Sequence, residues 1–254
     1  MGLVREPAQA ASMAQPHETA PLPTGSLRPL VSPTPRLPST PSVAYVPPSD
    51  PVGCPSRASV TAASSLADLR RTTEGCLACP LGPGRLKFVF GEGNPQAKLM
   101  FVGEGPGRDE DQLGRPFVGK AGELLDKMIG AIGMQRDQTY IANVVKCRPP
   151  DNRTPTTEEA HTCLGYLHRQ IELIQPAVIV TLGATPLREL VGVSEGITRV
   201  RGQWKRVKVG DREIPVMPTF HPAYVLRQYT QEVRRAVWED LKTAKEWADK
   251  AEGA

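Results

Sequence analysis

The chain has 254 residues and a formal net charge of +4, and it contains 26 prolines and five cysteines. This length suits one domain with a substantial core plus extensions. The charge is too small to indicate a nucleic-acid partner by itself. No run approaches the roughly 18 to 20 apolar residues of a membrane span, and no basic start precedes an apolar stretch, so we expect a soluble, non-secreted protein without a membrane partner.

The first quarter of the chain differs in composition from the rest. Thirteen of the prolines lie between Pro7 and Pro55, in a stretch rich in Ala, Ser and Thr without a sustained apolar period. Such a segment buries too little surface to fold. We expect residues 1–63 to be a disordered extension without chemistry, and residues 64–254 to be one folded domain. A spacer, or a ligand for an aromatic groove, is the alternative for the extension.

From Ser65 onward, short apolar runs alternate with longer amphipathic segments. This alternation predicts a three-layer α/β/α fold with a central, mostly parallel four-stranded sheet. Strands are expected at residues 98–102, 139–145, 177–182 and 216–220, and helices at 119–132, 156–174, 186–191 and 231–250. Ligands bind beyond the carboxyl ends of such strands, in the loops that start at Gly103, Lys146, Gly183 and His221.

Four of the five cysteines have a suggestive spacing. Cys76 and Cys79 form a C-x-x-C after a short polar helix, Cys147 ends the second strand, and Cys163 lies in the following helix. Four thiols in this pattern suit either tetrahedral zinc or an iron–sulfur cluster. The alternatives are ordinary buried cysteines or redox thiols. Cys54 lies in the extension.

Basic residues gather around Trp204, with no acidic residue between Ile197 and Gly210. This segment is predicted to be a hairpin with its turn at Gly202-Gln203. Phosphates would bind there, or the charges would simply be solvated. The basic residues are Arg199, Arg201, Lys205, Arg206 and Lys208.

Several motifs occur together with the four cysteines. They are GEGPGRDED at 103–111, GRPFVGKAG at 114–122, NVVKCRPP at 143–150, NRTP at 152–155 and HPAY at 221–224. In their order and spacing, over roughly residues 66–247, the chain resembles the family 4 uracil-DNA glycosylases. The resemblance implies a DNA repair enzyme that flips uracil out of single- or double-stranded DNA and hydrolyses its N-glycosidic bond. It also implies a cytoplasmic, nucleoid-associated monomer of bacterial or archaeal type, working beside other base excision repair enzymes.

The same resemblance implies a structural [4Fe-4S] cluster held by Cys76, Cys79, Cys147 and Cys163. It also suggests that Phe117 stacks on the extruded base, although an ordinary core phenylalanine is the alternative. One amide at Asn143 would accept from uracil N3–H and donate to O4, a pattern that cytosine reverses. Gly103, Glu104, Gly105 and His221 are expected to complete the uracil pocket.

Cleavage builds negative charge on uracil, so we expect donors near O2, supplied by His221 and loop N–H groups. A structural histidine is the alternative for His221. Water must attack the anomeric carbon, and Glu104, Glu110 and Asn152 are the candidates to position it. The better-known sister family has an aspartate at the position of Gly105, which places the base, if there is one, at Glu110 or with water oriented by Asn152.

After His221, the segment from Tyr224 to Arg227 is predicted to be a wedge that enters the DNA groove, or else the start of a helix. Two other readings of the whole chain remain. One is a non-catalytic or uracil-trapping iron–sulfur DNA-binding module, although the loop at 148–155 lacks the basic, histidine-containing insertion of such relatives. The other is a zinc-dependent enzyme, which would need an open coordination position that four cysteines do not leave.

Overall fold

The computed structural model describes residues 54–251, and the predicted extension up to residue 53 lies outside this range. Residues 54–251 form a six-stranded sheet in the order β1-β3-β2-β4-β6-β5. The four central strands run parallel and correspond to the four predicted ones. They are β2 (Leu99–Gly103), β3 (Tyr140–Asn143), β4 (Val178–Leu182) and β6 (Arg212–Thr219).

The predicted strand number of four is too small, because an antiparallel strand adds to each edge. One edge is β1 (Glu92–Gly93), which is too short to leave a pattern in the sequence. The other is β5 (Lys205–Val209), which pairs with β6 around a turn at Gly210-Asp211. The predicted hairpin turn at Gly202-Gln203 is therefore wrong, and the chain before it forms the short helix α8 (Ile197–Val200).

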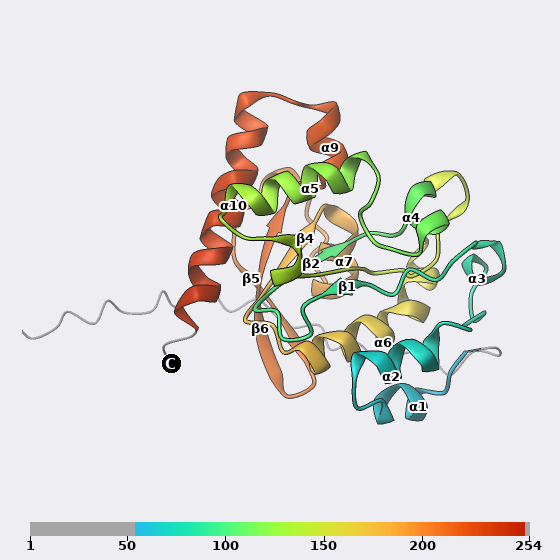
Figure 1. Cartoon of the computed structure of the whole chain (residues 1–254). Coiled ribbons are helices and arrows are strands. Elements are labelled where there is room, and N and C mark those ends of the chain that lie inside the picture. Colours follow the sequence, from blue (N-terminus) through green and yellow to red (C-terminus); the bar gives the residue numbers. More distant parts are fainter. Residues whose placement is uncertain (1–53, 252–254) are drawn as a thin grey trace, which may run out of the picture. The chain divides into compact units, whose positions relative to one another are not determined.

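Helices cover both faces of the sheet, as predicted (Figure 1). Side chains of each strand alternate between two apolar clusters, because successive residues of a strand point to opposite faces. In β2, Leu99 and Phe101 pack toward α5 (Lys120–Ala131) and α10 (Gln231–Lys250). Met100 and Val102 pack into the opposite cluster, which includes α6 (Thr157–Ile174). All three helices were predicted within one residue of these bounds.

Smaller helices complete the domain. Residues 57–62, which were expected in the extension, form α1, and Val60 is buried in the cluster that includes α6. The remaining helices are α2 (Leu66–Thr73), α3 (Leu81–Gly84), α4 (Arg108–Leu113), α7 (Ala184–Val191) and α9 (Pro222–Arg227), with single turns η1 (Arg136–Gln138) and η2 (Pro150–Asn152). Within residues 54–251 there is no helix with the length and apolar character of a membrane span.

Candidate active site

A pocket of about 730 Å³ opens at the carboxyl ends of the parallel strands. The loops after β2, β3, β4 and β6 all contribute to its lining, as the sheet topology predicts. The chain passes from β2 to β3 on one side and later to β4 on the other, so the loops after β2 and β4 diverge there and leave a crevice. The pocket therefore lies where α/β sheets ordinarily bind ligands.

Asn143, the last residue of β3, lines this pocket. Its side chain is 1% exposed, and within residues 54–251 its Oδ1 atom has no hydrogen-bond partner. A buried polar atom without a partner is uncommon and costs free energy. The neighbouring residue in β2 is Gly103, where a Cβ atom would lie 2.4 Å from Oδ1 of Asn143 and 2.5 Å from the ring of Phe117. Only glycine leaves room for both side chains.

Phe117 lines the same pocket as Asn143. Its side chain is 6% exposed, and its ring lies 5.8 Å from the ring of His221 at an angle of 33°. Its φ angle of 51° is in the left-handed region, which a bulky residue rarely adopts. An aromatic ring, an amide and an imidazole thus line one end of the pocket, and they come from three different loops or strand ends.

His221 is the N-cap of α9, and its Nδ1 atom accepts a hydrogen bond of 3.1 Å from the backbone N–H of Ala223. The accepting nitrogen carries no proton, so the neutral ring bears its proton on Nε2. Burial, together with the positive charge of Arg227, lowers the pKa of His221 to about 4. At neutral pH the side chain is therefore an uncharged hydrogen-bond donor.

Two of the predicted acidic residues have different surroundings. Glu104 lines the pocket, and its Oε2 atom accepts a 2.5 Å hydrogen bond from the Thr185 hydroxyl. Glu110 also lines the pocket, but its carboxylate accepts from three backbone N–H groups, those of Gly107, Val118 and Gly119. Glu110 therefore holds the start of α4 against the loop before α5, and this role leaves it little capacity to bind water.

Asn152 is exposed at the edge of the pocket, and its Oδ1 atom accepts a 2.8 Å bond from Arg148 Nε. Both Asp151 and Asn152 have positive φ angles, which these residue types tolerate better than most. Gly105 also lines the pocket, with no room for a larger residue because a Cβ atom there would lie 2.7 Å from Val145.

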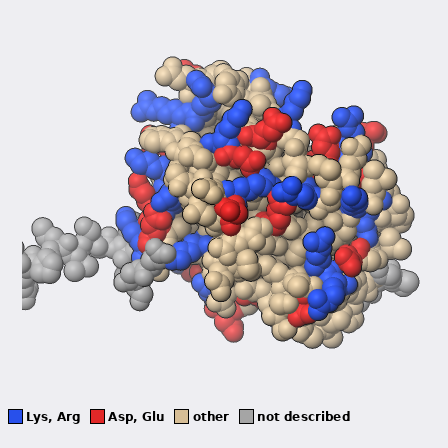
Figure 2. Space-filling model, in the orientation of Figure 1, with Lys and Arg blue, Asp and Glu red and all other residues tan. Residues whose placement is uncertain are grey.

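The five residues predicted to bind DNA are not equivalent. Arg227 lines the pocket, whereas Tyr224 packs on Phe220 with ring centroids 4.8 Å apart. Arg201 forms an ion pair with the buried Asp240, and its predicted contact with DNA stays a prediction. Arg199 is exposed on α8, and Lys205 begins β5. The face of the molecule in Figure 2 shows Lys and Arg interspersed with Asp and Glu, without a broad basic patch.

Sequence reasoning missed several pocket residues. Arg153, Thr185 and Arg188 line the pocket, and Arg153 also pairs with Glu159 in the first turn of α6. Lys146 is fully buried, and its Nζ donates to the Asn143 carbonyl at 2.9 Å and to Gln170 Oε1 at 2.6 Å. Burial lowers the pKa of Lys146 to about 8. A lysine directly after the apolar residues Val144 and Val145 was the sequence signal that could have indicated its bond to the Asn143 carbonyl at the end of β3.

The four cysteines of the predicted cluster lie in one region. Cys76, Cys147 and Cys163 are buried and Cys79 is half-buried, and each thiol interacts electrostatically with at least two of the others. Cys147 lies four residues beyond the end of β3, rather than ending it. Among residues 54–251, no group of three or more Cys, His, Asp or Glu side chains is arranged as a metal site.

The surroundings of these thiols suit a thiolate-held group. Arg85 Nη1 lies 3.3 Å from Cys147 Sγ, and the Tyr166 hydroxyl donates to Cys76 Sγ at 3.1 Å. Backbone N–H groups of Leu81 and Gly82 are directed at Cys79. Burial raises the pKa of Cys147 to about 11, so a bound metal would be needed to hold this sulfur as thiolate. Cys54 Sγ lies 2.9 Å from the Tyr166 hydroxyl.

The chain is similar in sequence to known proteins over the segment that forms the pocket. The model of the uracil DNA glycosylase superfamily matches residues 90–242. The chain is 51% identical over 179 residues to the type-4 uracil-DNA glycosylase of Thermotoga maritima. The aligned residues cover 69% of this chain and 90% of that protein. The chain belongs to the type-4 uracil-DNA glycosylases.

Two archaeal relatives of the same name are also similar. The Sulfurisphaera tokodaii protein is 46% identical over 189 residues, covering 72% of this chain and 85% of that protein. The Archaeoglobus fulgidus protein is 43% identical over 182 residues, covering 70% and 90%. The family expected from the sequence motifs is thus confirmed. The superfamily match spans every residue that lines the pocket, whereas Cys76 and Cys79 precede it.

Proposed function

We propose that the protein removes uracil from DNA by hydrolysing its N-glycosidic bond, which leaves an abasic site for base excision repair. The observation that carries this proposal is the buried Oδ1 atom of Asn143, which has no partner within the described residues and faces a pocket also lined by Phe117 and His221. Uracil offers an N3–H donor beside an O4 acceptor, and one amide satisfies both. Cytosine offers the opposite pattern and would leave the buried amide mispaired.

A base reaches such a pocket only after it leaves the stack. The volume of about 730 Å³ accommodates a flipped nucleotide together with its sugar, and the basic side chains of Arg153, Arg188 and Arg227 line it. These cations support contact with the flanking phosphates. Arg199, Lys205 and the segment at Tyr224 are proposed as outer contacts with single- or double-stranded DNA.

Bond cleavage would proceed with negative charge developing on uracil and positive charge on the deoxyribose. The Nε2–H group of neutral His221 is proposed to donate to uracil O2, because its Nδ1 atom is already occupied by the Ala223 N–H. A donor fixed in advance stabilises the developing charge without reorganisation. Phe117 would stack on the base and hold it in the plane of the Asn143 amide.

Water then attacks the anomeric carbon. We assign its positioning to Glu104, which lines the pocket with one oxygen anchored by Thr185, and to Asn152 at the pocket edge. The three backbone bonds of Glu110 make this carboxylate a support for the loop that carries Phe117. The phosphates of the substrate would help to stabilise the cationic sugar.

We further propose that Cys76, Cys79, Cys147 and Cys163 hold a [4Fe-4S] cluster, which supplies no redox step to a hydrolysis. The four neighbouring thiols and the groups directed at their sulfur atoms support this choice. The cluster would fasten the segment after α2 and the loop after β3 to α6. We also expect a monomer that works in the cytoplasm, associated with the nucleoid through DNA and followed by other repair enzymes.

The deciding experiment is single-turnover incubation of the purified, cluster-containing protein with single- and double-stranded uracil oligonucleotides, followed by alkali cleavage at abasic sites. Uracil-dependent cleavage is expected on both, with none on matched cytosine or thymine strands. A protein that retains its metal and binds uracil-DNA but produces no abasic sites would instead be a binding module.

A further inference from the structure

The loop that carries Phe117 is held in an unusual backbone conformation. Phe117 has a φ angle of 51°, although bulky side chains avoid positive φ. Its carbonyl also approaches α5 so closely that a Cβ atom on Gly122 would lie 1.9 Å from the oxygen. A backbone of this kind persists only where the surrounding structure fixes it.

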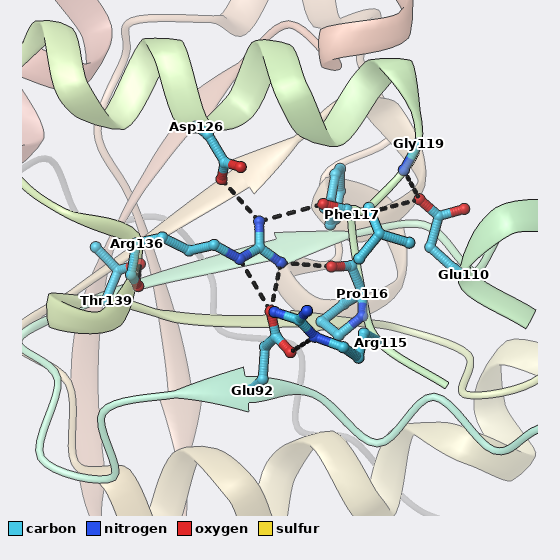
Figure 3. A network of polar contacts seen from close by, with 10 residues as sticks. Glu92, Glu110, Arg115, Pro116, Phe117, Gly119, Asp126, Arg136 and Thr139 are labelled. Carbon is cyan, nitrogen blue, oxygen red and sulfur yellow. Dashed lines mark hydrogen bonds and ion pairs between the residues drawn. The ribbon is translucent and has the colours of Figure 1, made fainter. Parts of the chain in front are cut away.

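Arg136 binds the carbonyl groups of Pro116 and Phe117 in this loop (Figure 3). The Arg136 guanidinium donates to the Phe117 carbonyl at 3.2 Å and to the Pro116 carbonyl at 2.5 Å. It also donates from Nη1 to Asp126 at 2.8 Å, and from Nε and Nη2 to Glu92 at 2.9 and 2.7 Å. An arginine side chain has five N–H donors. These five bonds account for all of them.

Glu92 fixes the arginine to the sheet. It lies on the edge strand β1, opposite Ile141 of β3, two residues before Asn143. Its carboxylate also accepts two bonds from Arg115, at 2.7 and 3.1 Å. Arg136 and Arg115 differ in one useful respect, because only Arg136 donates to the carbonyls of Pro116 and Phe117. The edge strand β1, which pairs with the strand that presents Asn143, thus anchors the arginine that binds the carbonyl of Phe117.

The backbone on the other side of Phe117 is held as well. The N–H groups of Val118 and Gly119 donate to Glu110 at 2.9 and 3.0 Å. Two charged side chains from outside the loop therefore bind the peptide groups on either side of Phe117, as Figure 3 shows. Without the arginine, the residue is free to relax to negative φ, and its ring would swing away from Gly103 and the pocket.

We propose that Arg136, anchored by Glu92, is a positioning residue that keeps the Phe117 ring in place to stack on the flipped base. The proposal rests on the proposed function, since it assigns a role in the same pocket. Arg136 touches neither base nor sugar and acts only through Phe117. Its loss should weaken binding of the base as well as the rate of cleavage, because both depend on the position of the ring.

The test is a double-mutant cycle between Arg136→Gln and Phe117→Ala, measured by single-turnover cleavage of a uracil oligonucleotide and by the inhibition constant of free uracil. Arg136→Gln should lower kcat/KM by roughly 10- to 100-fold and weaken inhibition by uracil. In the Phe117→Ala background the same change should have almost no further effect, because the ring it positions is gone. Arg136→Lys should recover little, because an ammonium group cannot bind two carbonyls and Glu92 together.

Arg115→Gln is the matched control, since it removes a partner of Glu92 without touching the loop carbonyls, and it should keep wild-type kinetics. The proposal would be overturned if the losses of kcat/KM in Arg136→Gln and Phe117→Ala multiply in the double variant. It would also be overturned if Arg115→Gln and Arg136→Gln lose kcat/KM equally. If Arg136→Gln does not fold, Glu92→Gln replaces it in the cycle under the same criteria. A wild-type protein that releases no uracil would refute the proposed function. In that case the dissociation constant of free uracil, measured by direct binding to the same variants, replaces the inhibition constant and reports separately on the ring.

Discussion

Asn143 combines deep burial with an Oδ1 atom that no described residue satisfies. Because we propose that its side chain binds the base, and its Oδ1 atom makes no hydrogen bond within the described residues, Asn143→Ala should change the melting temperature little. It should lower the single-turnover rate on uracil-DNA by roughly 100-fold, since two hydrogen bonds to the base are lost and the base stays desolvated. Single-turnover cleavage and thermal melting of the same preparation check both parts. A variant that keeps the wild-type rate would remove Asn143 from the recognition step.

His221 gives a prediction about pH. Its pKa is lowered to about 4 in the folded protein, below the unfolded value of about 6.5. A histidine whose pKa is lowered by folding favours the unfolded state when it is protonated, so its contribution to stability falls as the pH drops from about 6.5 toward 4. Between pH 7 and 5, the melting temperature of the wild type should therefore fall more than that of His221→Gln. Parallel pH dependences in the two proteins would contradict the assignment.

The same residue should leave the cleavage rate of the wild type without an inflection near pH 6.5, because the ring stays neutral throughout that range. His221→Gln retains a side-chain N–H and is expected to lose less activity than His221→Ala. A single-turnover pH profile of the three proteins checks this order. An inflection near pH 6.5 in the wild type that is absent from the glutamine variant would indicate a charged imidazole in catalysis.

At the scale of elements, Gln170 connects α6 to the segment that follows β3 and to the segment that precedes β1. Its Oε1 atom accepts from buried Lys146 at 2.6 Å, and its Nε2 atom donates to the Phe90 carbonyl at 2.9 Å. Gln170→Leu leaves a buried cation and a buried carbonyl without these partners, which should cost about 3 kcal/mol of unfolding free energy. Denaturant unfolding measures this loss. Gln112→Leu on the exposed side of α4 is the control and should change stability by less than about 0.5 kcal/mol.

The elements also show where a sequence pattern is sufficient. Long amphipathic helices such as α6 and α10 have a full apolar face, and their predicted bounds agree with the structure. The edge strands β1 and β5 have no such pattern in the sequence. β1 has two residues, and Gly202 and Gly210 both have positive φ, so two turns were available for the hairpin of β5. Pairing with β6, a tertiary contact, selects the second.

For the whole molecule, the proposed cluster links segments far apart in the sequence. Protein purified without oxygen should contain iron and sulfide and absorb visible light, whereas a zinc protein would be colourless. Cys163→Ala should lose the iron and melt at a lower temperature, because the segments around Cys76 and Cys147 are no longer tied to α6. Cys54→Ala is the control, since it leaves the four proposed ligands intact. Zinc in place of iron, or full iron content in Cys163→Ala, would contradict the assignment.

The sequence by itself determined the layered fold, the four parallel strands, the family and the group of residues at the strand ends. Apolar periodicity and the order of the motifs are properties of the sequence, so they can be recognised without coordinates. Only the tertiary structure decided which partners these residues have. It occupied Glu110 with backbone N–H groups, paired Arg201 with Asp240, and brought Arg136 to the carbonyl of Phe117. The partners of Arg201 and Arg136 are distant in sequence, so no local pattern predicts them.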